Sequence, residues 1–315
     1  MSLVSLRDIQ KARERIAGRI HHTPTFSASS LGGMVGATLS LKAELFQKTG
    51  SFKVRGVLNR LLDLSPEDLR RGLVTLSAGN HGAALAWAAA AAGTSATVVM
   101  PATAVKSKID AIRGYGGEVV QTGGDLLEQT LALQQERGLT LVHPFDDPLI
   151  IAGQGTAGLE ILEDTPDVEA VVVPVGGGGL ISGIAAAVKR CRPEVRVIGV
   201  EPTGSDAMTR SLAAGTPVRL ERNKTIADGL TAPFAGAQTL AHVQAFVNEV
   251  VLVDDETILR ALRLIIERAK LVAEPAGAAA FAALLAGAVR LAPESRVVCV
   301  VSGGNVDPSL LKGVL

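Results

Sequence analysis

Short apolar runs rich in Val and Ile alternate along this chain with longer stretches of helical pattern. Several of these runs are apolar at consecutive positions, as expected for strands that are buried on both faces. Strands that alternate with helices indicate parallel sheets covered by helices, so we predict an α/β fold. The predicted strands are Leu73–Leu76, Ala96–Met100, Glu118–Gln121, Ala170–Pro174, Arg196–Val200, Val250–Val253 and Arg296–Val301, and the main predicted helices are Gly82–Ala92, Ala104–Gly114, Asp125–Arg137, Leu180–Cys191 and Asp255–Lys270.

The chain has 315 residues, a length that suits one large α/β unit or two lobes. Two series of strands and helices follow each other and meet near Pro144. We predict a small lobe of residues 71–144 and a large lobe of residues 1–70 plus 145–315, each a mainly parallel twisted sheet covered by helices. No C-terminal regulatory domain is expected. Ligands bind such sheets beyond the carboxyl ends of the strands, so a cleft between the lobes is the expected site.

Composition argues against several classes of partner. The 31 basic and 31 acidic residues give a formal net charge of zero, and the basic residues form no runs that would attract nucleic acid. The apolar stretch Ala83–Ala92 is too short to span a membrane. No signal-peptide core is present, and Cys191 and Cys299 fit no zinc-binding spacing. Interpreted as buried free thiols, they suit a reducing compartment. We predict a cytoplasmic protein that binds neither nucleic acid nor membranes.

Lys53 stands between an aromatic and an apolar residue in the segment Ser51–Gly56. Partial desolvation would lower the pKa of its ammonium group and favour the neutral, nucleophilic amine. By itself, a lysine in this setting is most often an ordinary solvated helix residue.

A loop of small residues, Ser77-Ala78-Gly79-Asn80-His81-Gly82, directly follows the predicted strand Leu73–Leu76. Small side chains let the backbone approach a ligand, and the following helix offers unpaired N–H groups. A substrate carboxylate is a natural ligand for such a loop, and Asn80 can donate or accept a hydrogen bond at its mouth. The alternative interpretation is a capped strand–helix turn, in which His81 packs rather than acts as a base.

Two further glycine-rich loops also follow predicted strands. Four successive glycines, Gly176–Gly179, exceed what a turn needs, and they permit a nest of N–H groups around an anion at a helix N-terminus. The loop lacks the GxxxxGK[ST] pattern and any basic residue, so it suits a single phosphate better than a nucleoside triphosphate. The second loop is Ser302–Asn305, where Ser302 can contact a ring nitrogen or simply cap a turn.

Together and in this order, these segments resemble the fold type II pyridoxal 5′-phosphate (PLP) enzymes, specifically the threonine dehydratase and serine racemase family. The resemblance extends from about Leu6 to Asp307 and implies a tryptophan synthase β-like fold. It rests on Lys42-Ala43-Glu44, Gln47–Lys53, the SAGNHG loop, His143–Asp147, Ala152–Thr156, the glycine loop, Ile226–Gly229, Glu274-Pro275 and the SGGN loop.

The resemblance implies a role for each of these segments. Lys53 would form a Schiff base with PLP, Phe52 would flank the ring, Asn80 would meet its 3′-hydroxyl and Ser302 its nitrogen. The loop of Ser77, Ala78, Gly79, Asn80 and His81 would receive the substrate carboxylate. The phosphate would be held by Gly176, Gly177, Gly178 and Gly179, and Gly229 and Glu274 would lie near the cofactor.

The implied reaction is β-elimination from a small β-hydroxy amino acid, most naturally L-threonine or L-serine, to a 2-oxo acid and ammonia. Lys53, once displaced by the substrate amine, would take the α-proton, and PLP would spread the resulting charge. Ser302 is a neutral partner for the ring nitrogen. The ring is therefore a weaker electron sink than one paired with a carboxylate, which favours early departure of the β-hydroxyl.

Two positions help to separate dehydratases from racemases within the family. Serine racemases typically have a serine at the position of Ala78, where it serves as the second acid/base, and alanine has no proton to give. Phe145, which follows His143-Pro144, also resembles the dehydratase form and is expected beside the substrate. Both residues favour elimination over racemisation.

A divalent-metal site is matched only in part. Related racemases bind a cation through a Glu, a backbone carbonyl and an Asp six residues after that Glu. Glu201 and the Ser205 carbonyl match the first two ligands, but the third position is Ala207, and Asp206 is displaced by one residue. A hard cation needs several oxygen ligands, so Mg²⁺ is a secondary expectation.

Alternative functions are a serine racemase, a dehydratase for 3-hydroxyaspartate and, more remotely, a non-catalytic protein that binds a phosphate-bearing ligand. The last would leave Lys53 unexplained. The resemblance also implies a homodimer.

Overall fold

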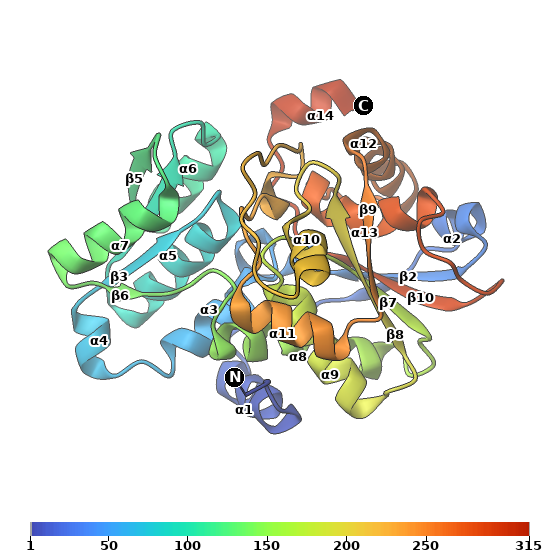
Figure 1. Ribbon diagram of the computed structural model, residues 1–315, viewed down its shortest axis with the longest axis horizontal. Helices are drawn as coiled ribbons and strands as arrows, with labels where there is room; N and C mark the ends of the chain where they lie inside the picture. Colours follow the sequence, from blue (N-terminus) through green and yellow to red (C-terminus); the bar gives the residue numbers. More distant parts are fainter. Residues whose placement is uncertain (1, 315) are drawn as a thin grey trace.

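The computed structural model describes residues 2–314 and contains two twisted sheets. Figure 1 shows the two sheets as separate bodies of strands, with β3–β6 on the left and the others on the right. The larger sheet has the order β1-β2-β10-β7-β8-β9 and the smaller β5-β4-β3-β6. Every neighbouring pair is parallel except β1 and β2. The strands are β1 Thr25–Ser27, β2 Thr38–Ala43, β3 Leu73–Leu76, β4 Ala96–Pro101, β5 Glu118–Thr122, β6 Thr140–Leu141, β7 Ala170–Pro174, β8 Arg196–Pro202, β9 Glu249–Val253 and β10 Arg296–Val301.

Helices cover both sheets, as the alternating pattern predicted. They are α1 Leu6–Ile16, α2 Ser29–Val35, α3 Lys53–Leu61, α4 Pro66–Arg70, α5 Asn80–Ala92, α6 Lys106–Gly114, α7 Leu126–Arg137, α8 Pro148–Asp164, α9 Gly179–Cys191, α10 Ala207–Ala214, α11 Ala237–Phe246, α12 Asp255–Leu264, α13 Pro275–Leu285 and α14 Pro308–Val314. Short 3₁₀ turns lie at Glu44–Phe46, Lys48–Gly50 and Asp228–Leu230.

The larger sheet is buried on both faces, which explains its continuous apolar strands. Along β7, Val172 packs into a cluster with α2, α12 and α13, whereas its neighbours Val171 and Val173 pack into a second cluster with α8, α9 and α11. Successive side chains of a strand point to opposite faces, so every position of β7 must be apolar.

The structure contains each strand that the sequence predicts, with ends that differ by two residues or fewer. The strands that the sequence did not predict are β1, β2 and β6. β2 contains Lys42, whose side chain is fully buried against Glu160 and Asp164. A buried ion pair between distant segments cannot be recognised from neighbouring residues, so the lysine in this segment hid the strand from the hydrophobic pattern. The predicted helix Asp255–Lys270 is also corrected, because α12 ends at Leu264 and a π-helix follows over Ile265–Ala269.

The connection between the two sheets includes α3, whose residues Val54, Val57 and Leu58 share one core cluster with Leu73 of β3 and Ala84 of α5. α3 therefore packs against elements of the smaller sheet. The lobe boundaries expected near residues 70 and 145 stay a prediction.

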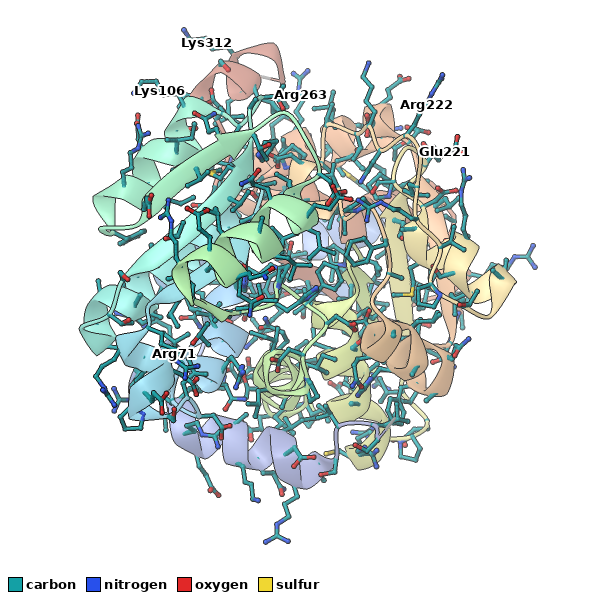
Figure 2. All side chains as sticks on the ribbon, turned by 60° about the vertical axis from the view of Figure 1, so that its left-hand side comes forward. Arg71, Lys106, Glu221, Arg222, Arg263 and Lys312 are labelled. Atoms are coloured by element: carbon teal, nitrogen blue, oxygen red, sulfur yellow. The ribbon has the colours of Figure 1, made fainter. Side chains whose placement is uncertain are left out.

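Charged side chains such as Arg71, Lys106, Glu221, Arg222, Arg263 and Lys312 project away from the ribbon (Figure 2). Cys299 in β10 is buried as expected, but Cys191 is exposed, because it is the last residue of α9, where the helix reaches the surface. Within residues 2–314, no helix is both long and apolar enough to cross a membrane.

Candidate active site

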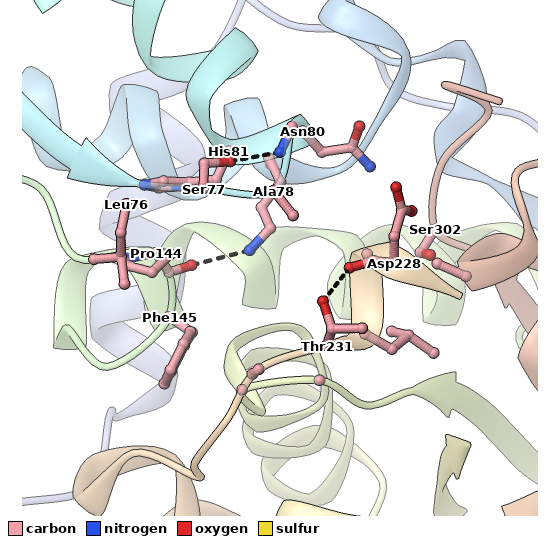
Figure 3. A pocket seen from close by; sticks show the side chains of 18 of the residues that line it. Leu76, Ser77, Ala78, Asn80, His81, Pro144, Phe145, Asp228, Thr231 and Ser302 are labelled. Atoms are coloured by element: carbon pink, nitrogen blue, oxygen red, sulfur yellow. Dashed lines mark hydrogen bonds between the residues drawn. The ribbon is translucent and has the colours of Figure 1, made fainter. Parts of the chain in front are cut away.

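A cavity of about 530 Å³ opens beyond the carboxyl ends of strands from both sheets. Its lining combines the loop after β3, the glycine loop after β7, Ser302 after β10 and the start of α3. Figure 3 shows Asn80, Asp228 and Ser302 on one side of the cavity and Leu76, Pro144 and Phe145 on the other. The parallel strands explain this convergence, because their carboxyl ends meet at one edge of each sheet.

Lys53 is the first residue of α3 and extends into this cavity. Its Nζ donates to the carbonyl oxygen of Pro144 at 3.0 Å and lies 5.2 Å from the centre of the Phe52 ring. Burial lowers the pKa of the Lys53 ammonium to about 8, against the opposing effect of the Glu274 carboxylate. A lysine of this kind loses its proton easily and becomes a nucleophile.

The loop after β3 is organised by Ser77. Its Oγ accepts hydrogen bonds from the N–H groups of Gly79 and Gly82, both at 2.9 Å. These bonds shape the turn into α5. The neighbouring Ala78 offers only a methyl group to the cavity. Burial lowers the pKa of His81 well below its usual range, helped by the charge of Lys53, so His81 is neutral and suits packing rather than proton transfer.

The glycine loop forms a cradle at the N-terminus of α9. The N–H groups of Gly177, Gly178 and Gly179 have no hydrogen-bond acceptor within the part of the chain that the structure describes. A Cβ on Gly177 would lie 2.3 Å from the Phe145 ring, and Gly178 has a φ of 91°. Only glycine therefore fits at these positions. Free N–H groups at a helix start attract an anion such as a phosphate.

Phe145 lies behind the glycine loop as well as beside the cavity. Its ring stacks edge-on to His143 at 4.7 Å and lies 5.7 Å from Phe234. The neighbouring Asp146 accepts three hydrogen bonds from the first N–H groups of α11. This segment supports the cradle in addition to any contact that it makes with a substrate.

Asn80, Ser302, Gly229 and Glu274 meet at the opposite side. Asn80 Nδ2 donates to Glu274 Oε1 at 2.6 Å, while Glu274 Oε2 is buried without a hydrogen-bond partner. Burial raises the pKa of Glu274 to about 7, although Lys108 opposes the shift. Gly229 lies next to this carboxylate, because a Cβ there would be 3.8 Å from Glu274 Oε1.

Lys108 of α6 is a site residue that the sequence did not reveal. Its Nζ lies 2.5 Å from Asp228 Oδ2 and 3.9 Å from Glu274 Oε2, and its stem lies so close to Gly79 that a Cβ there would be 2.4 Å from Lys108 Cδ. Lys108 thus joins α6 to the opposite wall of the cavity. A lysine within the ordinary polar pattern of α6 gives no such signal, and only the need for glycine at position 79 hints at it.

Glu201, the carboxylate expected to bind a metal, is engaged in other contacts. Glu201 accepts hydrogen bonds from Met208 N and from Thr209 N and Oγ1, at the start of α10. Asp206 pairs with Arg210. Within residues 2–314, no group of three His, Cys, Asp or Glu side chains could hold a metal ion. The structure therefore lends no support to the Mg²⁺ expectation.

The residues present fit PLP. The cofactor carries an aldehyde that a nucleophilic lysine can bind, a phosphate and a polar pyridine ring. The cavity brings together Lys53 with its lowered pKa, a glycine cradle that added Cβ atoms would fill, and the buried Glu274 Oε2, which has no hydrogen-bond partner within residues 2–314. These three observations match the three chemical parts of that molecule.

Comparison with known proteins agrees with this chemistry. Residues 16–303 match the family described as pyridoxal-phosphate dependent enzyme. The L-threonine ammonia-lyase of Thermotoga maritima is 44% identical over 317 residues, which cover 99% of this chain and 78% of that protein. Maize serine racemase has a TM-score of 0.94 at 39% identity, covering 99% of this chain and 97% of that one. The T.th. threonine deaminase has a TM-score of 0.90 at 44% identity, covering 96% of this chain and 99% of that one.

The two solved structures confirm the predicted fold type II architecture, since they superimpose on nearly the whole chain. The glycine cradle and Lys53 are consistent with the cofactor of the matched family. The chain belongs to the family of pyridoxal-phosphate-dependent enzymes.

Proposed function

We propose that this protein is an ammonia-lyase that converts L-threonine or L-serine into a 2-oxo acid and ammonia. The observation that carries the proposal is the convergence of Lys53, the glycine cradle and Ser302 on one cavity. The relatives named L-threonine ammonia-lyase and threonine deaminase support the same reaction.

Lys53 holds the cofactor and then acts on the substrate. Its pKa of about 8 makes the neutral amine available near neutral pH, so it can bind the PLP aldehyde and later accept the substrate α-proton. When bound, PLP delocalises the negative charge that forms on the substrate Cα. Phe52 would flank the ring, and the N–H groups of Gly176–Gly179 would hold the phosphate. Asn80 and Ser302 would contact the ring oxygen and the ring nitrogen.

The loop from Ser77 to His81 binds the substrate carboxylate. Ser77 holds the turn in shape through its two hydrogen bonds, and α5 begins at Asn80 with its N-terminus toward the cavity. The positive end of a helix favours a carboxylate. With carboxylate and amine both held, the β-hydroxyl would take up a proton and leave as water. The released enamine would tautomerise to an imine, which water hydrolyses to the 2-oxo acid and ammonia.

Serine racemase is the second candidate, because relatives of that name are also similar over nearly the whole chain. Racemisation needs a proton donor on the face opposite Lys53. Ala78 has no proton to give, and His81 is neutral and buried. These residues favour elimination.

A 3-hydroxyaspartate dehydratase is less well supported. Its substrate carries a second carboxylate, which would need a cation of its own. The cavity lining contains Lys53 and Lys108, and Lys108 is already paired with Asp228. A non-catalytic phosphate-binding protein would leave the lowered pKa of Lys53 without a purpose.

The test measures 2-oxo acid formation by the PLP-loaded protein with L-threonine, L-serine, D-serine and 3-hydroxyaspartate, together with chiral analysis of recovered serine. We expect 2-oxo acid from the first two substrates at rates above racemisation. Recovery of mainly D-serine from L-serine would favour the racemase. Borohydride reduction should attach the cofactor to Lys53, and failure to do so would refute the site.

The homodimer, the cytoplasmic location and a weak dependence on Mg²⁺ stay predictions. Analytical ultracentrifugation of the loaded protein tests the first. Activity after chelator treatment tests the third, and we expect little change because the Glu201 carboxylate is occupied by the start of α10.

A further inference from the structure

Asn305 is a polar residue of the SGGN loop that no role above requires, and both hydrogens of its amide are engaged. Asn305 Nδ2 donates to the carbonyl oxygen of Thr49 and to Asn80 Oδ1, each at 2.8 Å. It thereby connects the segment before Lys53 to the start of α5. These two segments lie far apart in the sequence and meet at the cavity.

The approach of Asn305 depends on unusual backbone in the lysine segment. Thr49 has a φ of 59°, and Gly50 has a φ of 74°. A Cβ on Gly50 would lie 2.4 Å from Asn305 Oδ1, so glycine is needed for the amide to fit. Gly304 N also donates to Gly50 O at 2.9 Å. The loop is therefore built around this amide.

The contacts of Asn80 determine which way its own amide faces. Its Oδ1 accepts from Asn305, and its Nδ2 donates to Glu274 Oε1 at 2.6 Å. If the Asn80 amide were turned over, two N–H donors would face each other at Asn305, and the Asn80 oxygen would face an oxygen of Glu274. The first contact is repulsive at any pH and the second whenever Glu274 is ionised, so the two neighbours select the same orientation.

Asn80 and Glu274 line the cavity, whereas Asn305 lies behind Asn80 and outside the lining. The N–H end of the Asn80 amide therefore lies on the cavity side, and its carbonyl end lies on the protein side. Glu274 takes one of the two Nδ2 hydrogens, which leaves the other available for a group in the cavity. Only a hydrogen-bond acceptor suits that position.

We propose that Asn305 is a positioning residue that, together with Glu274, fixes Asn80 as a hydrogen-bond donor to the ring oxygen of PLP. The inference rests on the proposed function, because it assumes that the cofactor ring lies beside Asn80. A donor at this place stabilises the deprotonated ring oxygen over the protonated one, since a hydrogen bond to the charged form favours that form. The residue thus tunes the electronics of the cofactor without touching it.

The absorption spectrum of the bound cofactor tests the proposal directly. A deprotonated ring oxygen gives a visible band, and a protonated one a near-ultraviolet band. Asn305→Asp keeps the shape of the side chain but replaces the donor that faces Asn80 with an acceptor, which favours the reversed amide. We expect the near-ultraviolet to visible ratio to rise about five- to tenfold, as for the loss of one hydrogen bond of ordinary strength.

Asn305→Ala separates orientation from structural support. It removes the donor but adds no acceptor, so we expect a smaller rise of about two- to threefold. A merely structural role predicts the reverse order, because alanine removes more packing than aspartate does. In an Asn80→Ala background, the Asn305 substitutions should change the ratio by less than about twofold, since no amide remains to be oriented.

Asn248→Asp is the matched control for the added charge. Asn248 lies before β9, where its Oδ1 accepts from Val197 N, and it does not line the cavity. Its spectrum should equal that of the wild type. Circular dichroism of the cofactor-free variants identifies any that fail to fold. If Asn305→Asp does not fold, the spectral change caused by Asn305→Ala in the wild type is compared with the change in the Asn80→Ala background. A change that needs Asn80 supports the positioning role, and one that does not need it contradicts that role.

The outcomes separate this inference from the proposed function. Wild-type protein that binds no PLP or forms no 2-oxo acid refutes the proposed function. Wild-type protein that does both, with Asn305→Ala shifting the ratio as much as Asn305→Asp or shifting it equally without Asn80, overturns the role of Asn305 alone.

Discussion

Lys53 and Arg55 lie two residues apart on the first turn of α3, but their surroundings are opposite. Arg55 is fully buried and donates to Glu44 and Glu160 as well as to two threonine hydroxyls. Lys53 has a single carbonyl oxygen as its hydrogen-bond partner within residues 2–314. The Arg55 guanidinium therefore has many hydrogen-bond acceptors around it, whereas the Lys53 ammonium has one.

This difference sets the charge state of each group. Burial lowers the pKa of Lys53 to about 8, whereas for Arg55 the carboxylates of Glu44 and Glu160 outweigh burial and hold the pKa above its ordinary value. Carboxylates show the same contrast. Burial raises the pKa of Glu274, but at Glu160 the charge of Arg55 outweighs burial and lowers the pKa. A buried ionisable group that is fully paired keeps its charge and stabilises the fold, whereas one that is incompletely paired has a shifted pKa and can act chemically.

Substituting Lys53 is the strongest way to test this contrast. Lys53→Met keeps the apolar stem and removes the amine. We expect 2-oxo acid formation to fall by at least about 10²–10⁴-fold, because the group that moves the proton is lost. The free energy of unfolding of the cofactor-free protein should stay equal or rise, since a poorly paired buried cation is removed. A variant that keeps more than about a tenth of the activity would contradict the assignment.

The same substitution at Arg55 should do the opposite. Arg55→Met leaves Glu44 buried without its cation and leaves Glu160 with Lys42 alone, so we expect a loss of about 3–5 kcal/mol in the free energy of unfolding, measured by urea denaturation. Arg13→Met is the control, because the Arg13–Glu163 pair is about half exposed and should contribute less than about 1 kcal/mol. Equal losses of unfolding free energy in Arg55→Met and Arg13→Met would show that the buried pairing of Arg55 contributes no more than an exposed ion pair.

The pH dependence of stability sharpens the comparison for the carboxylates. The pKa of Glu274 is raised from 4.5 to about 7 in the folded protein, so its stabilising contribution is present below pH 4.5 and is lost as the pH rises through 7. Relative to Glu274→Gln, the cofactor-free wild type should lose about 2–3 kcal/mol between these limits. Urea unfolding of both proteins at about pH 5 and about pH 8 measures this difference. An equal change in the free energy of unfolding of both proteins between the two pH values would show that the pKa of Glu274 is not raised in the folded protein.

The smallest effect is expected at Lys108. Lys108→Met removes the cation beside Asp228 and Glu274 and makes the cavity more negative, which disfavours a phosphate-bearing cofactor. Because Asp228 is 38% exposed, we expect the Kd for PLP to rise only about two- to fivefold. Lys106→Met is the control, since Lys106 lies on the same helix with its side chain 86% exposed and should leave the Kd unchanged. An unchanged Kd in Lys108→Met would show that the pair has no influence on the cofactor.

The sequence alone determined the architecture and the chemical type of this protein. The apolar runs of β7 and β10 required burial on both faces, and the glycines at 176–179 required a close backbone approach. Both signals are local, because side-chain alternation and backbone freedom are properties of consecutive residues. The order of the motifs then indicated the family, which the comparisons bear out.

Only the tertiary structure decided which polar groups are paired and which are left free. Nothing near Lys42 predicts that it lies buried beside Glu160, or that Lys108 reaches Asp228. The contact of Asn305 with Asn80 spans 225 positions. Such contacts depend on where distant segments meet, and a polar side chain looks the same in the sequence whether it faces water or a partner. The lowered pKa of Lys53 is likewise decided by the tertiary structure, because the burial that lowers it exists only in the folded chain.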